Sequence, residues 1–192
     1  MKNIDLRSDT VTLPSNRMRQ AIFEAKLGDD VFCEDYSVNL LEDKASKITG
    51  KESALLVPSG TMGNLVSILT HCARGEEVVL GHKSHTFLYE AGGISAFGGI
   101  HSRQLKNNDD GTIDIDKIKS AIREENVHFP PTTLICLENT HNRCFGAPLT
   151  KSYMKEVSNV AKENKCKVHL DGARIFNAAV TLRVNVKELT QD

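Results

Sequence analysis

Residues 167–174 read KVHLDGAR, a short apolar strand that runs into an aspartate, a glycine and an arginine. Similar apolar runs occur at 54–57, 77–80, 100–105 and 133–137, and segments with helical spacing separate them. Short strands that alternate with helices favour a mainly parallel sheet covered by helices on both faces. The sequence therefore predicts an α/β fold with three layers, helix, sheet and helix.

The helices are predicted from apolar spacing and from capping residues. Apolar side chains recur every three or four residues in 14–27, 61–73 and 150–164. Ser37 is expected to cap a further helix that ends at Gly50, and Asp114 one that runs to Glu124. No internal repeat, low-complexity linker or clear domain boundary interrupts this order.

Composition excludes several classes of protein. The 192 residues carry a formal net charge of −1, which gives no electrostatic attraction to nucleic acid or to an anionic membrane. No run approaches the roughly 20 apolar residues of a membrane span, and the charged N-terminus lacks a signal-peptide core. Cys72 and Cys136 lie in apolar runs and are expected to be buried thiols. We therefore expect a cytosolic protein. His82 and His85 lack a third ligand at a suitable spacing, so no metal site is predicted.

Polar residues follow four of the predicted strands. They are Ser59–Thr61, His82–His85, Glu138–His141 and Asp171–Arg174. Because ligands of parallel sheets bind beyond the carboxyl ends of the strands, these segments are the candidates for a common site.

Each segment has a functional and an ordinary interpretation. Gly60 and Thr61 at a helix start could cradle a phosphate, although such a turn by itself more often marks an ordinary helix start. Asp171 could pair with the protonated ring nitrogen of pyridoxal phosphate (PLP), or cap the next helix. Arg174 could hold a carboxylate, or lie on the surface. His85 and His141 could transfer protons near neutral pH, or be solvated loop residues.

Taken together, the motifs resemble the low-specificity L-threonine aldolases, which are PLP enzymes of fold type I within the aromatic amino-acid β-eliminating lyase and threonine aldolase group. The resemblance covers nearly the whole chain, in order. The segments that carry it are LRSDTVT at 6–12, GDDV at 28–31, PSGTM at 58–62, YEAGG at 89–93, ENTHN at 138–142 and HLDGARIFN at 169–177.

The resemblance implies a role for each candidate. Gly60 and Thr61 would bind the cofactor phosphate, and Asp171 would pair with the ring nitrogen. His85 would lie over the ring and, with His141, near the substrate hydroxyl. The substrate carboxylate would be held by Ser8 and Arg174. The reaction would cleave L-threonine or L-allo-threonine to glycine and acetaldehyde, in a homodimer or homotetramer.

The chain also departs from the family pattern. The expected Ser-Lys pair, whose lysine forms the Schiff base, does not follow 171–174 before the chain stops at Asp192. No Schiff-base lysine is therefore predicted within residues 1–192, and the C-terminal part of the large domain and the small domain are expected to be absent. Phe32 and Cys33 stand where the family has Tyr-Gly, which leaves substrate preference open.

Alternatives to the aldolase remain. They are a β-eliminating lyase of the same fold acting on aromatic or sulfur amino acids, a non-catalytic relative that binds PLP or only dimerises, and a nucleotide-binding Rossmann protein. His141 favours the aldolase because deprotonation of a hydroxyl needs a base. The missing G-x-G-x-x-G pattern disfavours the Rossmann protein.

Overall fold

A parallel sheet forms the centre of the protein. The structure, a computed structural model, describes residues 4–191, and within them four strands pair in the order β2-β1-β3-β4, all parallel. The strands are β1 (Glu77–Gly81), β2 (His101–Leu105), β3 (Thr132–Glu138) and β4 (Lys167–Asp171). Glu138 and Asp171 are partners in the register of β3 and β4, so both carboxylates reach the same carboxyl edge. The predicted parallel α/β fold is confirmed.

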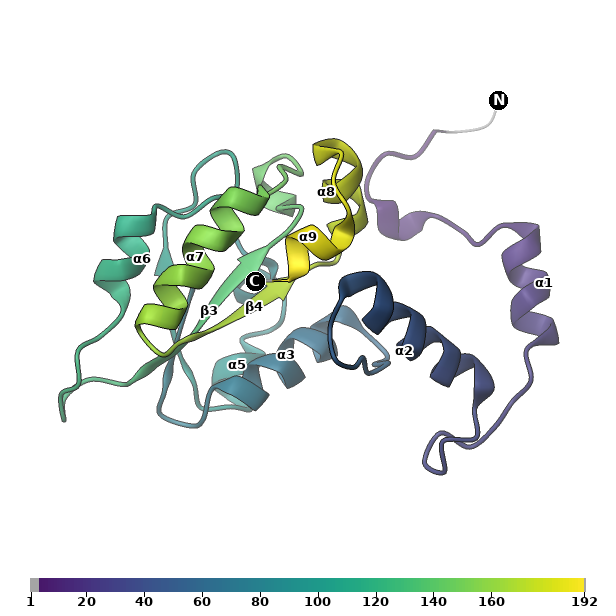
Figure 1. The fold of residues 1–192 in the computed structure, drawn as a ribbon, viewed down its shortest axis with the longest axis horizontal. Helices are drawn as coiled ribbons and strands as arrows, with labels where there is room; N and C mark the ends of the chain where they lie inside the picture. The colour runs from purple at the N-terminus through teal and green to yellow at the C-terminus, as the bar shows by residue number, and fades with distance from the viewer. Residues whose placement is uncertain (1–3, 192) are drawn as a thin grey trace.

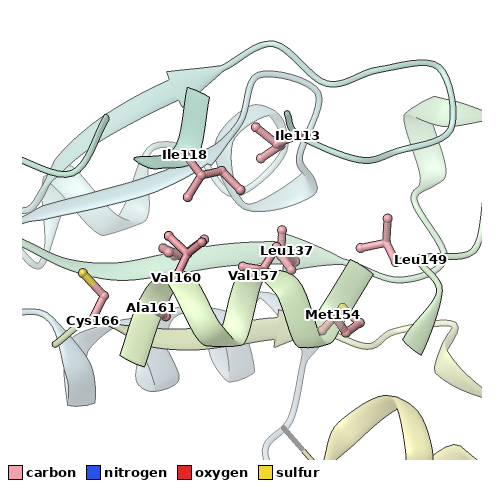
Figure 2. Packing of buried hydrophobic residues seen from close by; sticks show 10 residues of the cluster. Ile113, Ile118, Leu137, Leu149, Met154, Val157, Val160, Ala161 and Cys166 are labelled. Carbon is pink, nitrogen blue, oxygen red and sulfur yellow. The ribbon is translucent and has the colours of Figure 1, made fainter. Parts of the chain in front are cut away.

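Alternate side chains of the strands face two helical layers. Leu134 and Cys136 of β3 pack with α3 (Gly60–His71) and α5 (Gly93–Ala96). Ile135 and Leu137 point the other way, towards α6 (Ile115–Ala121) and α7 (Lys151–Glu163). Figure 1 shows the two helix pairs on opposite sides of the sheet, and Figure 2 shows the packing under α7. The predicted three layers are therefore present.

The helix starts follow capping chemistry. Ser59, Asp114 and Thr150 each accept a hydrogen bond from a backbone N–H in the first turn of α3, α6 and α7. α2 (Tyr36–Thr49) ends at Gly50, as predicted, with a φ of +69°. Its N-cap is Asp35 and not the predicted Ser37, because the Asp35 carboxylate accepts from two backbone N–H groups.

The predicted strand at 54–57 is wrong. This segment has no strand partner in the described part of the chain, and Leu55 is 71% exposed. Its Leu56 N–H donates instead to Glu42 Oε1, at 2.7 Å. An apolar run without a neighbouring strand cannot form the ladder of hydrogen bonds that defines a sheet. The apolar pattern of 54–57 alone was therefore not enough to predict a strand.

The N-terminal part lies away from the sheet. α1 (Asn16–Glu24) is shorter than the predicted helix, and its apolar residues Met18 and Ile22 are exposed. Figure 1 shows α1 at a distance from the main body, whereas the short helix η1 (Asp9–Val11) lies near the C-terminal helices. The remaining helices are α4 (His85–Leu88), η2 (Asn142–Cys144), α8 (Ile175–Leu182) and α9 (Val186–Thr190).

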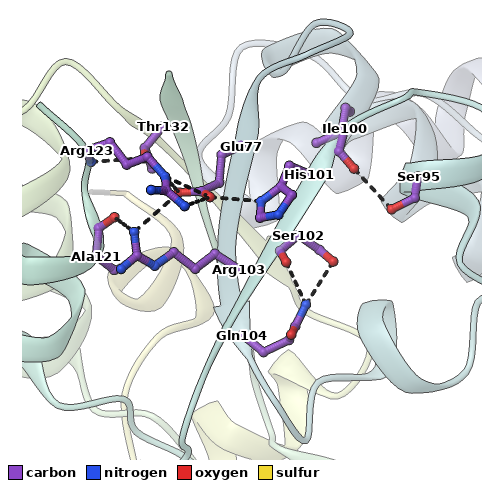
Figure 3. Close-up of polar contacts among 10 residues, drawn as sticks. All are labelled: Glu77, Ser95, Ile100, His101, Ser102, Arg103, Gln104, Ala121, Arg123 and Thr132. Carbon is purple, nitrogen blue, oxygen red and sulfur yellow. Dashed lines mark hydrogen bonds and ion pairs between the residues drawn. The ribbon is translucent and has the colours of Figure 1, made fainter. Parts of the chain in front are cut away.

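A charged cluster joins the strands at the opposite, amino-terminal edge of the sheet. Glu77 is fully buried there and accepts hydrogen bonds from Arg123 at 3.1 Å and Thr132 at 3.2 Å. His101 lies 2.9 Å and Arg103 3.8 Å from the same carboxylate (Figure 3). The charge of Glu77 is thus compensated by side chains of β2 and of the segment after α6.

The cysteines form no disulfide bond in the described residues. Cys72 and Cys136 are buried, as predicted, and all five thiols are free. Among residues 4–191, no helix is long and apolar enough to cross a membrane.

Candidate active site

A cavity of about 340 Å³ opens at the carboxyl edge of the sheet. Six of the seven residues predicted for the site line it, and only His141 does not. The six are Ser8, Gly60, Thr61, His85, Asp171 and Arg174. A larger hollow of about 840 Å³, bordered by residues 122–132 and 164–165, lies at the opposite edge and contains none of them. The chemistry of the residues, and not the size of the hollow, identifies the smaller cavity as the candidate site.

The start of α3 forms one wall of the cavity. Ser59 accepts from the Met62 N–H at 3.1 Å and so uses one of the free donors of the first turn. A side chain added at Gly60 would meet nothing within 4 Å, so the space in front of the helix start is open. A twelve-residue helix presents the remaining N–H groups and a partial positive charge there. Gly60 and Thr61 therefore fit a phosphate group.

Asp171 forms the floor of the cavity at the end of β4. Its Oδ1 accepts from the Ala173 N–H at 3.1 Å, and its Oδ2 from Asn64 Nδ2 at 3.0 Å. Among the described residues, no lysine, arginine or histidine forms an ion pair with this nearly buried carboxylate. A cationic ring N–H in the cavity would supply the missing partner. The alternative role as a helix cap is not adopted, because Arg174 is the residue that precedes α8.

His85 is held at the cavity by two carboxylates. Its backbone N–H donates to Glu138 Oε2 at 2.8 Å, and its ring Nδ1 lies 2.9 Å from Glu90 Oε1. The ring of Tyr89 is tilted against it, with 5.5 Å between ring centroids. The His85 ring is partly exposed, so it can contact a ligand in the cavity.

His141 lies behind the cavity. It is 1% exposed, and neither ring nitrogen has a hydrogen-bond partner in the described part of the chain. Its Nε2 is 4.0 Å from Glu138 Oε2. Burial lowers the pKa of His141, and the charge of Glu138 opposes that shift only in part. The structure therefore separates His141 from the wall on which His85 lies.

Arg174 has an anionic partner from the N-terminal segment. Its Nε and Nη2 donate to the two carboxylate oxygens of Asp9, at 2.7 and 2.8 Å. This bidentate pair raises the pKa of Arg174 and lowers the pKa of Asp9. Ser8 and Thr10, on either side of Asp9, both line the cavity. The guanidinium thus binds a carboxylate of the protein through two hydrogen bonds, and the predicted contact with a substrate carboxylate stays a prediction.

Sequence reasoning missed three polar residues of the site. Asn64 lies one helical turn after Gly60 and so faces the same side of α3, which is a signal that the spacing contained. Glu90 and Asp9 have no comparable spacing signal, because Glu90 lies in the turn after α4 and Asp9 in the separate short helix η1, although both stand within the motifs YEAGG and LRSDTVT. Glu138 was noted only as part of a segment, and it contacts His85 directly.

The residues present fit PLP. An open helix start suits the phosphate, and a buried carboxylate without a cation suits the ring nitrogen. One ring residue, His85, also lines the cavity.

Comparisons with known proteins agree with this assignment. A family model described as beta-eliminating lyase matches residues 5–192. A low-specificity L-threonine aldolase of Arabidopsis thaliana is 48% identical over 194 residues, which cover 100% of this chain and 54% of the relative. That of Escherichia coli K12 is 46% identical over 188 residues, covering 98% and 56%.

A solved structure of Leishmania major threonine aldolase shares the fold, with a TM-score of 0.61 and 24% identity over 69% of this chain and 39% of that one. The chain spans about half the length of the curated relatives it matches. Because the family model covers nearly the whole sequence, the chain belongs to the beta-eliminating lyase family.

Proposed function

We propose that this chain provides the cofactor-binding part of a PLP-dependent aldolase that cleaves L-threonine and L-allo-threonine to glycine and acetaldehyde. The observation that carries the proposal is Asp171, a nearly buried carboxylate that faces the cavity with hydrogen bonds from amides alone. Low-specificity L-threonine aldolases among the relatives support the choice of reaction.

The residues divide the tasks of binding between them. Gly60 and Thr61 would hold the phosphate through the α3 start, and Asp171 would pair with the ring nitrogen. When bound, PLP supplies an electron sink for the negative charge left on Cα after the Cα–Cβ bond breaks. Ser8 and Arg174 would orient the substrate carboxylate, for which Arg174 has to exchange its contact with Asp9.

Proton transfer is assigned to His85. Its ring lines the cavity, where it can accept the proton of the substrate hydroxyl. His141, which we also expected near the hydroxyl, lies behind Glu138 and would act on the substrate only through that carboxylate. We therefore propose His85 as the principal base and His141 as a secondary contributor.

Binding of PLP tests the cofactor site. Equilibrium dialysis of the chain against PLP should give saturable binding that Asp171→Ala weakens strongly, since removing one partner of a buried charge pair is costly. Thr70→Ala, at the far end of α3, is the matched control and should bind as the wild type does. Equal binding by the Asp171 variant would contradict the role of this carboxylate.

A product assay separates the two reactions of the family. In a full-length protein that also supplies the Schiff-base lysine, incubation with PLP and L-threonine should yield glycine and acetaldehyde. Pyruvate and ammonia from serine or cysteine would instead support the β-eliminating reaction that gives the family its name. Binding of PLP without any product would favour the non-catalytic alternative.

We also propose that the full-length protein is a cytosolic homodimer or homotetramer. Support comes from α8, where the apolar side chains of Phe176 and Val180 are exposed on one face. Light scattering coupled to size-exclusion chromatography should detect the oligomer, and a monomer at micromolar concentration would contradict this proposal.

A further inference from the structure

A chain of hydrogen bonds lies beneath the cavity and links its two sides. It runs from the His85 ring to Glu90, from Glu90 to Asn64, and from Asn64 to Asp171. The members come from α4, the turn after it, α3 and β4. Glu90 and Asn64 are 6% and 7% exposed, so solvent takes little part in this network.

Asn64 lies at the centre of the network and contacts three other side chains. Its Nδ2 donates to Glu90 Oε1 at 2.7 Å and to Asp171 Oδ2 at 3.0 Å, while its Oδ1 lies 2.8 Å from His169 Nε2. Ionised carboxylates only accept hydrogen bonds, so the amide nitrogen has to face them. His169 must then donate to Asn64 Oδ1 through Nε2. All polar atoms of the Asn64 side chain are thereby used, and the amide has one orientation.

Glu90 receives both of its donors at one oxygen. Oε1 accepts from Asn64 Nδ2 and contacts His85 Nδ1 at 2.9 Å. A buried carboxylate held in place by Asn64 favours a proton on Nδ1 of the imidazole, because only a donor satisfies it. In neutral His85 the lone pair then remains on Nε2, for which no hydrogen-bond partner is found among residues 4–191.

The network also concentrates negative charge. One polar side-chain atom each of His85, Glu90 and Asp171 lies within 4.8 Å of the other two. Two carboxylates this close in a buried setting repel each other, and the Asn64 amide that donates to both offsets the repulsion. Glu90 therefore adds a buried negative charge that the protein must compensate, and this cost indicates that the Glu90 carboxylate has a specific role in the site.

We propose that Glu90 is a positioning residue that holds the His85 ring in its Nδ1-protonated form and leaves Nε2 as the proton acceptor of the cavity. Its consequence for turnover rests on the proposed function, in which His85 accepts a proton. The protonation form itself is a property of the chain without any cofactor.

The test measures which ring nitrogen of His85 carries the proton. Long-range ¹H–¹⁵N spectra of the histidine-labelled chain at pH 8, assigned with His85→Gln, should show His85 protonated on Nδ1. Glu90→Gln keeps an acceptor oxygen and should retain this form. Glu90→Ala removes the acceptor and should produce a mixture in which Nε2 carries the proton. The spectra of the other histidines and the thermal transition report whether each variant is folded.

Two outcomes would overturn the proposal. One is a wild-type His85 with its proton on Nε2, and the other is a folded Glu90→Ala chain that keeps Nδ1 protonated. In the active holoenzyme, kcat should fall at least tenfold for Glu90→Ala and be largely retained by Glu90→Gln, with KM changed little. A chain that shows the expected spectra but does not bind PLP would refute the proposed function and leave the role of Glu90 intact.

Discussion

Replacing Glu77 with alanine should destabilise the protein more than any single change at its surface. The carboxylate is completely buried at the amino-terminal edge of the sheet and accepts three hydrogen-bond contacts of 3.1 Å from Arg123. Thr132 and His101 provide two further contacts, at 3.2 and 2.9 Å. Removal of the carboxylate therefore leaves a cluster of cations without its only buried anion.

The size of the effect follows from the loss of one partner of a buried ion pair. Such a loss costs about 3–5 kcal/mol, because the remaining charge is left without compensation. A domain of this size is stable by roughly 5–15 kcal/mol, so about a fifth or more of the total is at stake. Glu77→Gln keeps the shape and one acceptor oxygen but removes the charge, and should lose at least about 1.5 kcal/mol.

Urea unfolding followed by circular dichroism at pH 7 measures these differences. The matched control is Asp43→Asn, which breaks an exposed pair with Lys47 and should leave the free energy of unfolding nearly unchanged. A loss below about 1 kcal/mol for Glu77→Ala would refute the reasoning, since it would mean that solvent already compensates the cluster.

Three further results are expected. Burial lowers the pKa of His141, so its contribution to the free energy of unfolding is complete above about pH 6.5 and is lost as the pH falls below that value. His141→Phe should therefore reduce the proton uptake on unfolding in acid by up to one proton. An unchanged pH dependence of the free energy of unfolding would contradict this. Gly111→Ala and Gly75→Ala both place a side chain at a positive φ, but only the new Cβ at position 111 would lie 2.8 Å from His141 Cβ. Gly111→Ala should therefore lower the free energy of unfolding by about 1–3 kcal/mol more than Gly75→Ala does. A thiol reagent should modify Cys33 rapidly and the four buried cysteines, whose pKa values burial raises, only after denaturation; more than one fast thiol would show that the core opens.

Local chemistry explains which elements were predictable. The predicted cap at Asp114 depends on neighbours within one helical turn, and the sequence contains those neighbours. The apolar runs of the four strands are also visible in the sequence. The run at 54–57 has the same composition as a strand, yet strand formation also needs a second strand beside it. Periodicity reports which face of a segment is apolar and does not report whether a partner is present.

The same distinction applies to the site. The rule that ligands bind beyond parallel strands correctly points to His85, Asp171 and Arg174, which follow β1 and β4 and line one cavity. Gly60 and Thr61 line it from a helix start without a strand before it, and Ser8 was expected there only from the family resemblance. His141 follows a strand as well, but the chain turns there so that the side chain enters the interior and not the cavity. The contact of Arg174 with Asp9 joins residues 165 positions apart, and no pattern within one element could reveal it.

Two buried carboxylates at opposite ends of the sheet, Glu77 and Asp171, differ in how their charge is compensated. Glu77, at the amino-terminal edge, has two arginines and a histidine within 4 Å, so the protein itself balances the charge. Asp171, at the carboxyl edge, has only the N–H groups of Asn64 and Ala173. Burial of a carboxylate is unfavourable in both places, but of these two only Glu77 has cationic partners within the described residues. Glu138, at the same edge as Asp171, is also buried and accepts hydrogen bonds from the backbone N–H groups of His85 and Asn142. Both carboxylates of this edge line the cavity, which therefore suits a cationic group, as we propose for the ring nitrogen of the cofactor at Asp171.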